Sequence, residues 1–490
     1  MVPGTALGVM LGDLVYTNLG FRRAKKQKRQ DVCAMPLGID AIALFGLTLG
    51  VIGPAFLLTK NADTAWAVGM AVLVVMGIVK TLTAFMGEAV RRNVPRAALL
   101  GSLGALAVVL IAYLPFVKII GDPVGGMVAF GVILLTLVAR VKLPYDIPGA
   151  LAAVGIGTIV YYIANLFGAT NSIEMPSVEA TFAFPWPTAH FLDGLALGAK
   201  YIPIAIPIAI SNVIGGIDNT ESAAAAGDEY KTRDILLVEG VATLIAGLCG
   251  GVIQNTPYIG HPAYKRMGGR AAYTLVTGLF IGIGAMFGLI GFLISVLPES
   301  VLVPILVFIG LEVCNQAYAA TERKHFAAVS ICFIPVIANL VFIQYNTMIA
   351  AAGITLADLR PDFQETYNAV MALGNGFILS AMLWAAMTVA LIDGGLRRAA
   401  YLAWAAAGLT LIGLIHSPFA DGRLFLPEAD LPASVYNVTT GYLLMGIVYF
   451  IMSAFNRHEN IQQDNRTAKD AKDAEGRNSF IIKENLRQEK

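Results

Sequence analysis

The chain has 490 residues, of which 57% are hydrophobic and only 14% are charged, and its mean hydropathy is +0.70. A soluble domain carries about 25% charged residues, so stretches such as VGMAVLVVMGIV (68–79) would leave too little polar surface in water. The composition therefore excludes a soluble protein and predicts an integral membrane protein. The formal net charge of +1 gives no reason to expect a nucleic-acid partner.

Two further classes are disfavoured by the residue pattern. The four cysteines are embedded in apolar sequence, which predicts small core residues rather than a disulfide framework or a thiolate metal site. The chain contains neither an HExxH motif nor a GxxxxGK[ST] loop, and no Ser/His pairing stands out. We therefore expect no enzyme, no catalytic residues, no metal and no cofactor.

Apolar stretches close to the length of about 20 residues that a bilayer requires recur along the chain. Because they are long and continuous, they favour helices over the short alternating strands of a β-barrel. The sequence predicts an all-α polytopic fold with fourteen such stretches, placed at 2–21, 33–58, 64–87, 97–118, 124–140, 147–168, 192–226, 234–253, 271–297, 300–320, 326–350, 366–394, 399–416 and 434–456.

The orientation follows from the loop FRRAKKQKRQ (21–30), whose six basic residues favour the cytoplasmic side. If successive loops alternate between the two sides of the membrane, the basic loop YKRMGGR (264–270) falls on the outer side, against the charge rule. It returns to the cytoplasmic side if the segment QNTPYIGHPAY (254–264) adds a crossing. Pro257, Gly260 and Pro262 do not fit a regular helix, so this crossing must be partly extended. Irregular backbone at membrane depth is tolerated only where protein buries it or where it lines a polar cavity. Counting this broken span, most basic residues of the short loops fall on the cytoplasmic side.

A second interrupted segment, VCAMPLGID (32–40), occurs early in another span, with Gly38 close to Asp40. In the segment 254–264, Gly260 likewise stands next to an ionisable residue, His261. Interrupted spans in matching positions are typical of transporter binding sites, because half-helix ends and unwound backbone supply dipoles and hydrogen bonds there. The alternative is that both segments are kinked helices without function.

Ionisable residues inside a membrane are functional candidates. The stretch IGGIDNTESAAAAG (214–227) ends a long span and places Asp218 and Glu221 on one helix face, with Asn219 and Ser222 nearby. A poorly solvated carboxylate there would suit proton uptake and release, whereas 218–222 could instead lie at the cytoplasmic surface. Glu312 is a weaker candidate for the same site, since it could equally hold two helices together. Tyr258 could stack on a flat ligand or simply pack.

These motifs together resemble the nucleobase/cation symporter family of uracil, xanthine, hypoxanthine and ascorbate permeases. The resemblance covers roughly residues 1–396 and rests on a GDLVY-containing helix before a broken span, on IDNTES, and on NTPYIG. It implies two inverted seven-segment repeats, divided between a core domain and a gate domain, with two discontinuous spans that each join a strand to a half-helix. By residue, it places the acidic substrate-binding position on Asp218 and the aromatic position on Tyr258.

The chain departs from this family in three places. Gly260 occupies the position of the family's second carboxylate. Ser222 occupies the position that holds a histidine in uracil permeases. Residues 2–21 match the second family segment, so the first is expected to be missing, through an upstream start site or a truncation. Two helices, 399–416 and 434–456, are additional. The predicted units are 1–93 (core, first part), 94–190 (gate, first part), 191–297 (core, second part), 298–396 (gate, second part), 397–456 (extra helices) and 457–490 (a disordered cytoplasmic tail).

The leading functional hypothesis is a permease that carries a nucleobase-like solute together with H⁺ or Na⁺, in a bacterial-type inner membrane and with a cytoplasmic C-terminus. An anion exchanger of the sulfate-permease type and a truncated paralogue without transport are the alternatives. Whether the protein forms a homodimer stays open. The predicted substrate-binding residues are Asp218, Asn219, Glu221, Ser222, Tyr258, Gly260, His261, Gly38 and Asp40, and the predicted ion-coupling residues are Asp218, Glu221 and Glu312.

Overall fold

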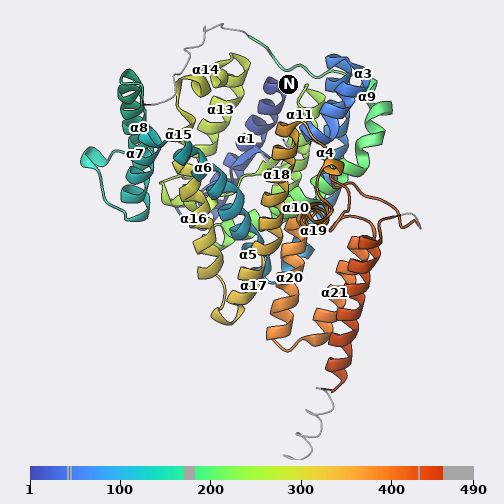
Figure 1. Ribbon diagram of the computed structural model, residues 1–490. Coiled ribbons are helices and arrows are strands. Elements are labelled where there is room, and N and C mark those ends of the chain that lie inside the picture. The colour runs from blue at the N-terminus through green and yellow to red at the C-terminus, as the bar shows by residue number, and fades with distance from the viewer. Residues whose placement is uncertain (41–43, 45–46, 170–181, 429–430, 456–490) are drawn as a thin grey trace, which may run out of the picture.

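The computed structural model describes residues 1–40, 44, 47–169, 182–428 and 431–455. It is built almost entirely of helices (Figure 1). Seven of the described helices are long and apolar enough to span a membrane, and an eighth candidate is the bent pair α19–α20. The predicted all-α polytopic fold is therefore confirmed. The predicted disordered tail, 457–490, lies outside the described residues.

The first half of the chain contains these elements: α1 (Val2–Gln27), β1 (Leu37–Ile39), η1 (Thr48–Ile52), α3 (Gly53–Thr59), α4 (Ala62–Asn93), α5 (Arg96–Leu106), η2 (Ala107–Ala112), α6 (Tyr113–Gly121), α7 (Pro123–Ile133), η3 (Leu134–Val138), η4 (Pro144–Asp146), α8 (Gly149–Leu166), α9 (Phe191–Gly198), η5 (Ala199–Tyr201) and α10 (Ile202–Ala225).

The second half contains α11 (Thr232–Leu248), β2 (Asn255–Pro257), α12 (His261–Arg266), α13 (Tyr273–Met286), α14 (Leu289–Val296), α15 (Glu299–Leu302), α16 (Pro304–Ala319), η6 (Arg323–His325), α17 (Phe326–Ile331), α18 (Phe333–Ala352), η7 (Leu356–Asp358), α19 (Pro361–Gly374), α20 (Phe377–Ile392) and α21 (Leu396–Leu411). A last helix, Ala433–Phe455, follows. The two additional C-terminal helices are thus present.

Local signals explain where several helices begin and break. The Asn61 side chain accepts hydrogen bonds from the backbone N–H groups of Asp63 and Thr64 and so caps the start of α4. Between α19 and α20 the chain bends by 73°. Gly376 occupies this bend with φ = +71°, a conformation that glycine adopts without a steric penalty. Continuous hydropathy over 366–394 could not reveal this break.

Both predicted interruptions are real, and their extended parts pair with each other. Strands β1 and β2 are antiparallel, with Leu37 opposite Pro257 and Ile39 opposite Asn255. The pairing continues past both strands, because Tyr258 N–H donates to Pro36 O and Asp40 N–H donates to Gln254 O. A β-ladder formed by residues more than 200 positions apart therefore lies within a helical protein.

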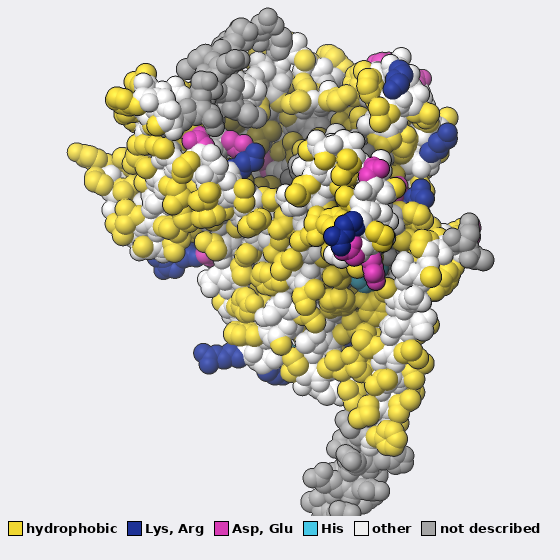
Figure 2. All heavy atoms as spheres, in the orientation of Figure 1, with side chains coloured by type: hydrophobic (Ala, Val, Ile, Leu, Met, Phe, Trp, Pro, Cys, Tyr) yellow, Lys and Arg dark blue, Asp and Glu magenta, His cyan; other side chains and the backbone are white. Residues whose placement is uncertain are grey.

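Contacts between side chains define two ends of the molecule. Arg91, Arg96, Arg266 and Arg398 gather at one end, here called the basic end, where α10 and α16 finish. Lys118, His190 and Glu299 lie at the opposite end. The basic end is the side that the loop charges predict to be cytoplasmic. Hydrophobic side chains cover most of the face between the two ends (Figure 2).

The orientation is open to a labelling test. Tyr145, in the connection before α8, and Trp186, before α9, are 96% and 71% exposed. We expect a cysteine at position 145 to react with a membrane-impermeant maleimide only from the cytoplasmic side, and one at 186 only from outside. Cys33, Cys249 and Cys332 are buried and Cys314 is half-buried, so the unsubstituted chain is the background control. Labelling of both positions from one side would refute the topology.

Candidate functional site

The strand pair is held by polar side chains from four surrounding helices. From α1, Asp13 accepts a hydrogen bond from Leu37 N–H at 2.8 Å. From α4, Lys80 Nζ donates to Asn255 O at 2.5 Å, and from α10, Asn219 Nδ2 donates to Pro257 O at 3.0 Å. Thr243, on α11, accepts from Asn255 N–H at 3.2 Å. Backbone groups that a helix would have paired internally are therefore satisfied by side chains inside the membrane.

Lys80 forms a fully buried ion pair with Glu239, at 2.7 Å, and both side chains have no exposed surface. The Lys80 ammonium also donates to Asn212 Oδ1 at 2.5 Å. Desolvation of two charges is offset only where the geometry is good and further hydrogen bonds are made. Lys80 makes such bonds, whereas neither Glu239 oxygen has a further hydrogen-bond partner among the described residues. This pair was not among the predicted site residues. The available signal was a lysine inside the predicted apolar stretch 64–87, but its partner lies 159 positions away and no local pattern could identify it.

Asp40 belongs to the same polar cluster. Its Oδ2 accepts hydrogen bonds from Asn212 Nδ2 at 2.7 Å and from Gln254 Nε2 at 2.9 Å. The amide of Asn212 therefore bridges Asp40 to Lys80. Asp40 lies just after β1 and is half-buried, whereas Gln254 is fully buried.

The polar face of α10 contacts α5 and α16. Asp218, 1% exposed, accepts a hydrogen bond from Ser102 Oγ on α5 at 2.7 Å. Ser222 Oγ donates to Gln316 Oε1 on α16 at 2.5 Å, and Gln316 Nε2 donates back to Ser222 O at 2.8 Å. Asp218 and Ser222 thus face side chains of α5 and α16.

Glu221 and Glu312 are both paired with arginines at the basic end. Glu221 accepts from Arg91 Nε at 2.7 Å and from Arg96 Nε at 2.6 Å. Glu312, on α16, forms an ion pair with Arg266 of α12. The predicted ion-coupling residues therefore separate into two that are neutralised by arginine and one, Asp218, whose described polar partner is a hydroxyl group.

The predicted residues of the second interruption pack against protein. Tyr258 lies beside Gly38 across the ladder, and a Cβ on Gly38 would come within 2.7 Å of its ring. Gly260 precedes α12 with φ = +120°, which requires glycine, and a Cβ there would come within 2.7 Å of Ile309 of α16. His261 Nε2 is hydrogen-bonded to Asp228 at 3.1 Å. These positions shape the crossing of the two broken spans.

A cluster around Asp228 ties the two broken spans together at the basic end. Asp228 accepts from Cys33 N–H, from His261 Nε2 at 3.1 Å and from Lys265 Nζ at 2.8 Å. Burial opposes ionisation of this carboxyl, but the hydrogen bonds from His261, Lys265 and Cys33 outweigh it, and the pKa of Asp228 is lowered from its ordinary value. Asp228 therefore acts as an ionised clamp in the connection between α10 and α11.

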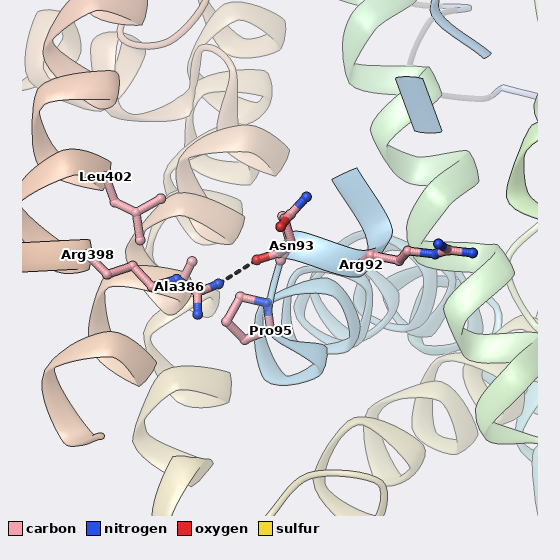
Figure 3. A pocket seen from close by; sticks show the side chains of 7 residues that line it. Arg92, Asn93, Pro95, Ala386, Arg398 and Leu402 are labelled. Atoms are coloured by element: carbon pink, nitrogen blue, oxygen red, sulfur yellow. Dashed lines mark hydrogen bonds between the residues drawn. The ribbon is translucent and has the colours of Figure 1, made fainter. Parts of the chain in front are cut away.

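A cavity of about 440 Å³ lies at the basic end, apart from the predicted site residues. Its lining comes from the connection between α4 and α5 and from α20 and α21, and comprises Arg92, Asn93, Val94, Pro95, Ala386, Arg398 and Leu402. Arg398 extends across it and donates to Asn93 O, whereas Arg92 points away (Figure 3). The additional helix α21 is thereby linked to the turn between α4 and α5. Among the described residues, no group of three or more His, Cys, Asp or Glu is arranged to hold a metal ion.

Comparisons with known proteins find similar structures but no matching family model or curated protein. Among solved structures, the chain is similar to the transmembrane domain of the cyanobacterial bicarbonate transporter BicA, at 12% identity and a TM-score of 0.38, over 78% of this chain and 96% of that one. It is also similar to SLC26A9, at 13% identity and a TM-score of 0.42, over 68% of this chain and 62% of that one.

These findings correct the assignment to nucleobase/cation symporters, because the structures found are a bicarbonate transporter and SLC26A9. The resemblance rested on short motifs around the two interrupted spans. Proline, glycine and a nearby polar residue are what any such interruption requires, so the motifs report the architecture rather than the solute.

The Asp228 clamp makes a testable contribution to stability. Asp228→Asn removes one charge from a buried, hydrogen-bonded group, and such losses amount to about 3–5 kcal/mol. We expect a lower Tm in detergent at pH 7. Because the folded pKa is below the unfolded value of about 3.9, the contribution is present above that value and is lost as pH falls through the folded pKa.

Asp31→Asn is the matched control, since Asp31 pairs with Arg29 and Lys265 nearby but its side chain is 54% exposed. An equal loss of Tm in both variants at pH 7 would contradict the clamp. So would a difference between wild type and Asp228→Asn that grows as the solution is acidified.

Proposed function

We propose that this protein is a secondary transporter that carries a small anion across the membrane. The observation that carries the proposal is the antiparallel pairing of β1 with β2 between two interrupted spans. Extended backbone among membrane helices is characteristic of carriers, whose substrates bind where helices are broken. An intramembrane enzyme would instead need a catalytic constellation, and the described polar side chains around the strands are used to hold them.

The position of α10 supports alternating access. Asn219 of this helix donates to Pro257 O of β2, whereas Asp218 and Ser222 contact α5 and α16. One helix thus links the strand pair to a different group of helices through a few hydrogen bonds. Such contacts can break and reform when one unit moves against another, which is how a carrier exposes its site to each side in turn.

The electrostatics favour an anion over a solute that presents N–H groups. Recognition of ring N–H groups needs carboxylates that are free to accept hydrogen bonds. Arginines occupy Glu221 and Glu312, which leaves only Asp218 of the three predicted carboxylates, with its Oδ1 unpartnered among the described residues. The basic end between α10, α12 and α16 carries Arg91, Arg96, Arg266, Lys265 and Arg29 against Glu221, Glu312, Asp228 and Asp31. This excess of positive charge attracts anions.

Transport can be tested with purified protein in liposomes. We expect saturable uptake of at least one of radiolabelled bicarbonate, chloride or sulfate. Asp218→Asn should reduce it by about tenfold or more, because it replaces the carboxyl group that faces α5 yet keeps an oxygen for the Ser102 hydroxyl. Asp193→Asn is the control, since that side chain is 72% exposed at the opposite end.

Saturable uptake of a nucleobase with no flux of any of the three anions would overturn the proposal of anion transport. Full anion uptake by Asp218→Asn would overturn only the role given to Asp218.

A further inference from the structure

The cavity of about 440 Å³ at the basic end shares no lining residue with the strand pair or with α10. Volumes of this order are typical of pockets that hold a small molecule. One wall comes from the connection between α4 and α5, and the other comes from α20 and α21. Because α21 is one of the two additional helices, the cavity lies where this helix meets the rest of the chain.

Arg398 supplies a positive charge to this cavity. Its guanidinium extends across the cavity and donates a hydrogen bond to Asn93 O (Figure 3). Among the described residues it forms no ion pair, and the acidic residue nearest to it along the chain, Asp393, is taken by Lys324 and His325. A guanidinium carries five N–H donors in a planar fork, so most of those of Arg398 are available to an anion.

The groups around Arg398 do not compensate its charge. None of the seven lining residues is acidic, and Arg92, the second basic one, is paired with Glu88 and points away (Figure 3). Arg398 and its neighbour Arg397 lie in the first turn of α21, which contains no acidic residue and no side-chain cap. The start of a helix is its positive end, so two arginines there are unfavourable without an anion.

The rest of the wall is apolar, and an apolar face of α4 leads to it. Four of the seven lining residues are apolar: Val94, Pro95, Ala386 and Leu402. On α4, Leu82 and Met86 are 66% and 64% exposed, and helical spacing places them on the same face as Asn93, which lines the cavity. Acyl chains cover an exposed apolar face of a membrane helix. A bound molecule can therefore keep a charged group at Arg398 and an apolar part along α4.

We propose that this cavity binds the headgroup of one anionic phospholipid from the leaflet that borders the basic end, with its phosphate at Arg398 and its acyl chains along the exposed face of α4. Basic pockets between membrane helices favour such headgroups. A free phosphate would match Arg398 but would leave the apolar wall uncovered. The lipid links α21 to the turn between α4 and α5, and its binding does not depend on which solute is transported.

The binding test uses the full-length protein, delipidated in detergent. At low salt, we expect dioleoylphosphatidylglycerol to raise Tm by about 2 °C or more over the same mole fraction of dioleoylphosphatidylcholine, whose headgroup has no net charge. Soluble glycerophosphate at the same concentration should give no shift, because it lacks acyl chains. Raising NaCl to about 0.5 M should reduce the shift, since Arg398 is exposed and its charge is screened by salt.

Two neighbouring arginines provide matched variants. Arg398→Gln removes the charge in the cavity and keeps an amide donor for Asn93 O, so it should lose most of the shift. Arg398→Lys keeps the charge and should retain most of it. Arg397→Gln is the control, because it removes the same charge from a guanidinium that lies over the Phe450 ring and does not line the cavity.

An equal loss of the shift in Arg397→Gln and Arg398→Gln would overturn the site, because the lipid would then be attracted by the basic end as a whole. An equal shift with glycerophosphate would assign the cavity to a soluble anion, and no difference between the two lipids in the wild type would also refute the proposal. Should Arg398→Gln fail to fold, Asn93→Asp decides, because Asn93 is exposed and a carboxylate there should repel the phosphate and remove the shift.

Discussion

The structure depends on one constraint: backbone N–H and C=O groups that leave a helix inside a membrane must find partners within the protein. Two spans are interrupted, and each supplies the extended segment that satisfies the other. Further groups are met by Asp13, Lys80, Asn219 and Thr243 from the surrounding helices. Much of the intramembrane polarity of this chain is therefore a consequence of the broken spans.

This constraint explains what the sequence could predict. Pro36, Gly38 and Pro257 mark the interruptions locally, and the distribution of loop charges required a crossing through 254–264 that hydropathy did not show. The pairing of the two segments and the Lys80–Glu239 contact depend on residues far apart in the chain. Helical periodicity identifies the buried face of a helix but not the element that packs against it. The resemblance to nucleobase/cation symporters was wrong because motifs around an interruption reflect backbone needs common to many carriers.

The two sides of the strand pair are built alike but charged differently. Helix α1 precedes the first interruption and α4 follows it, while α11 precedes the second and α13 follows it. Asp13 of α1 accepts a hydrogen bond from Thr277 of α13, and Glu239 of α11 pairs with Lys80 of α4. Each polar link thus joins the leading helix of one unit to the trailing helix of the other. A repeated plan fixes the backbone, and changes at these few positions decide where charge is placed.

The contacts of α10 indicate which of these interactions must stay and which can change. The hydrogen bond from Asn219 of α10 to Pro257 O of β2 lies within the unit that includes the strands. Its loss would deprive a backbone carbonyl inside the membrane of this donor. Asp218 and Ser102 are joined through side chains alone, whereas Gln316 contacts both the hydroxyl and the backbone carbonyl of Ser222. That carbonyl also accepts from Ala226 N–H, so water or a solute can replace these contacts at small free-energy change. Glu221 is different, because Arg91 lies in the last turn of α4 and Arg96 begins α5, and their shared carboxylate fixes the short turn at Pro95. Relative motion of the two groups of helices is therefore expected to hinge at this turn, with α10 sliding past α5 and α16 beyond it.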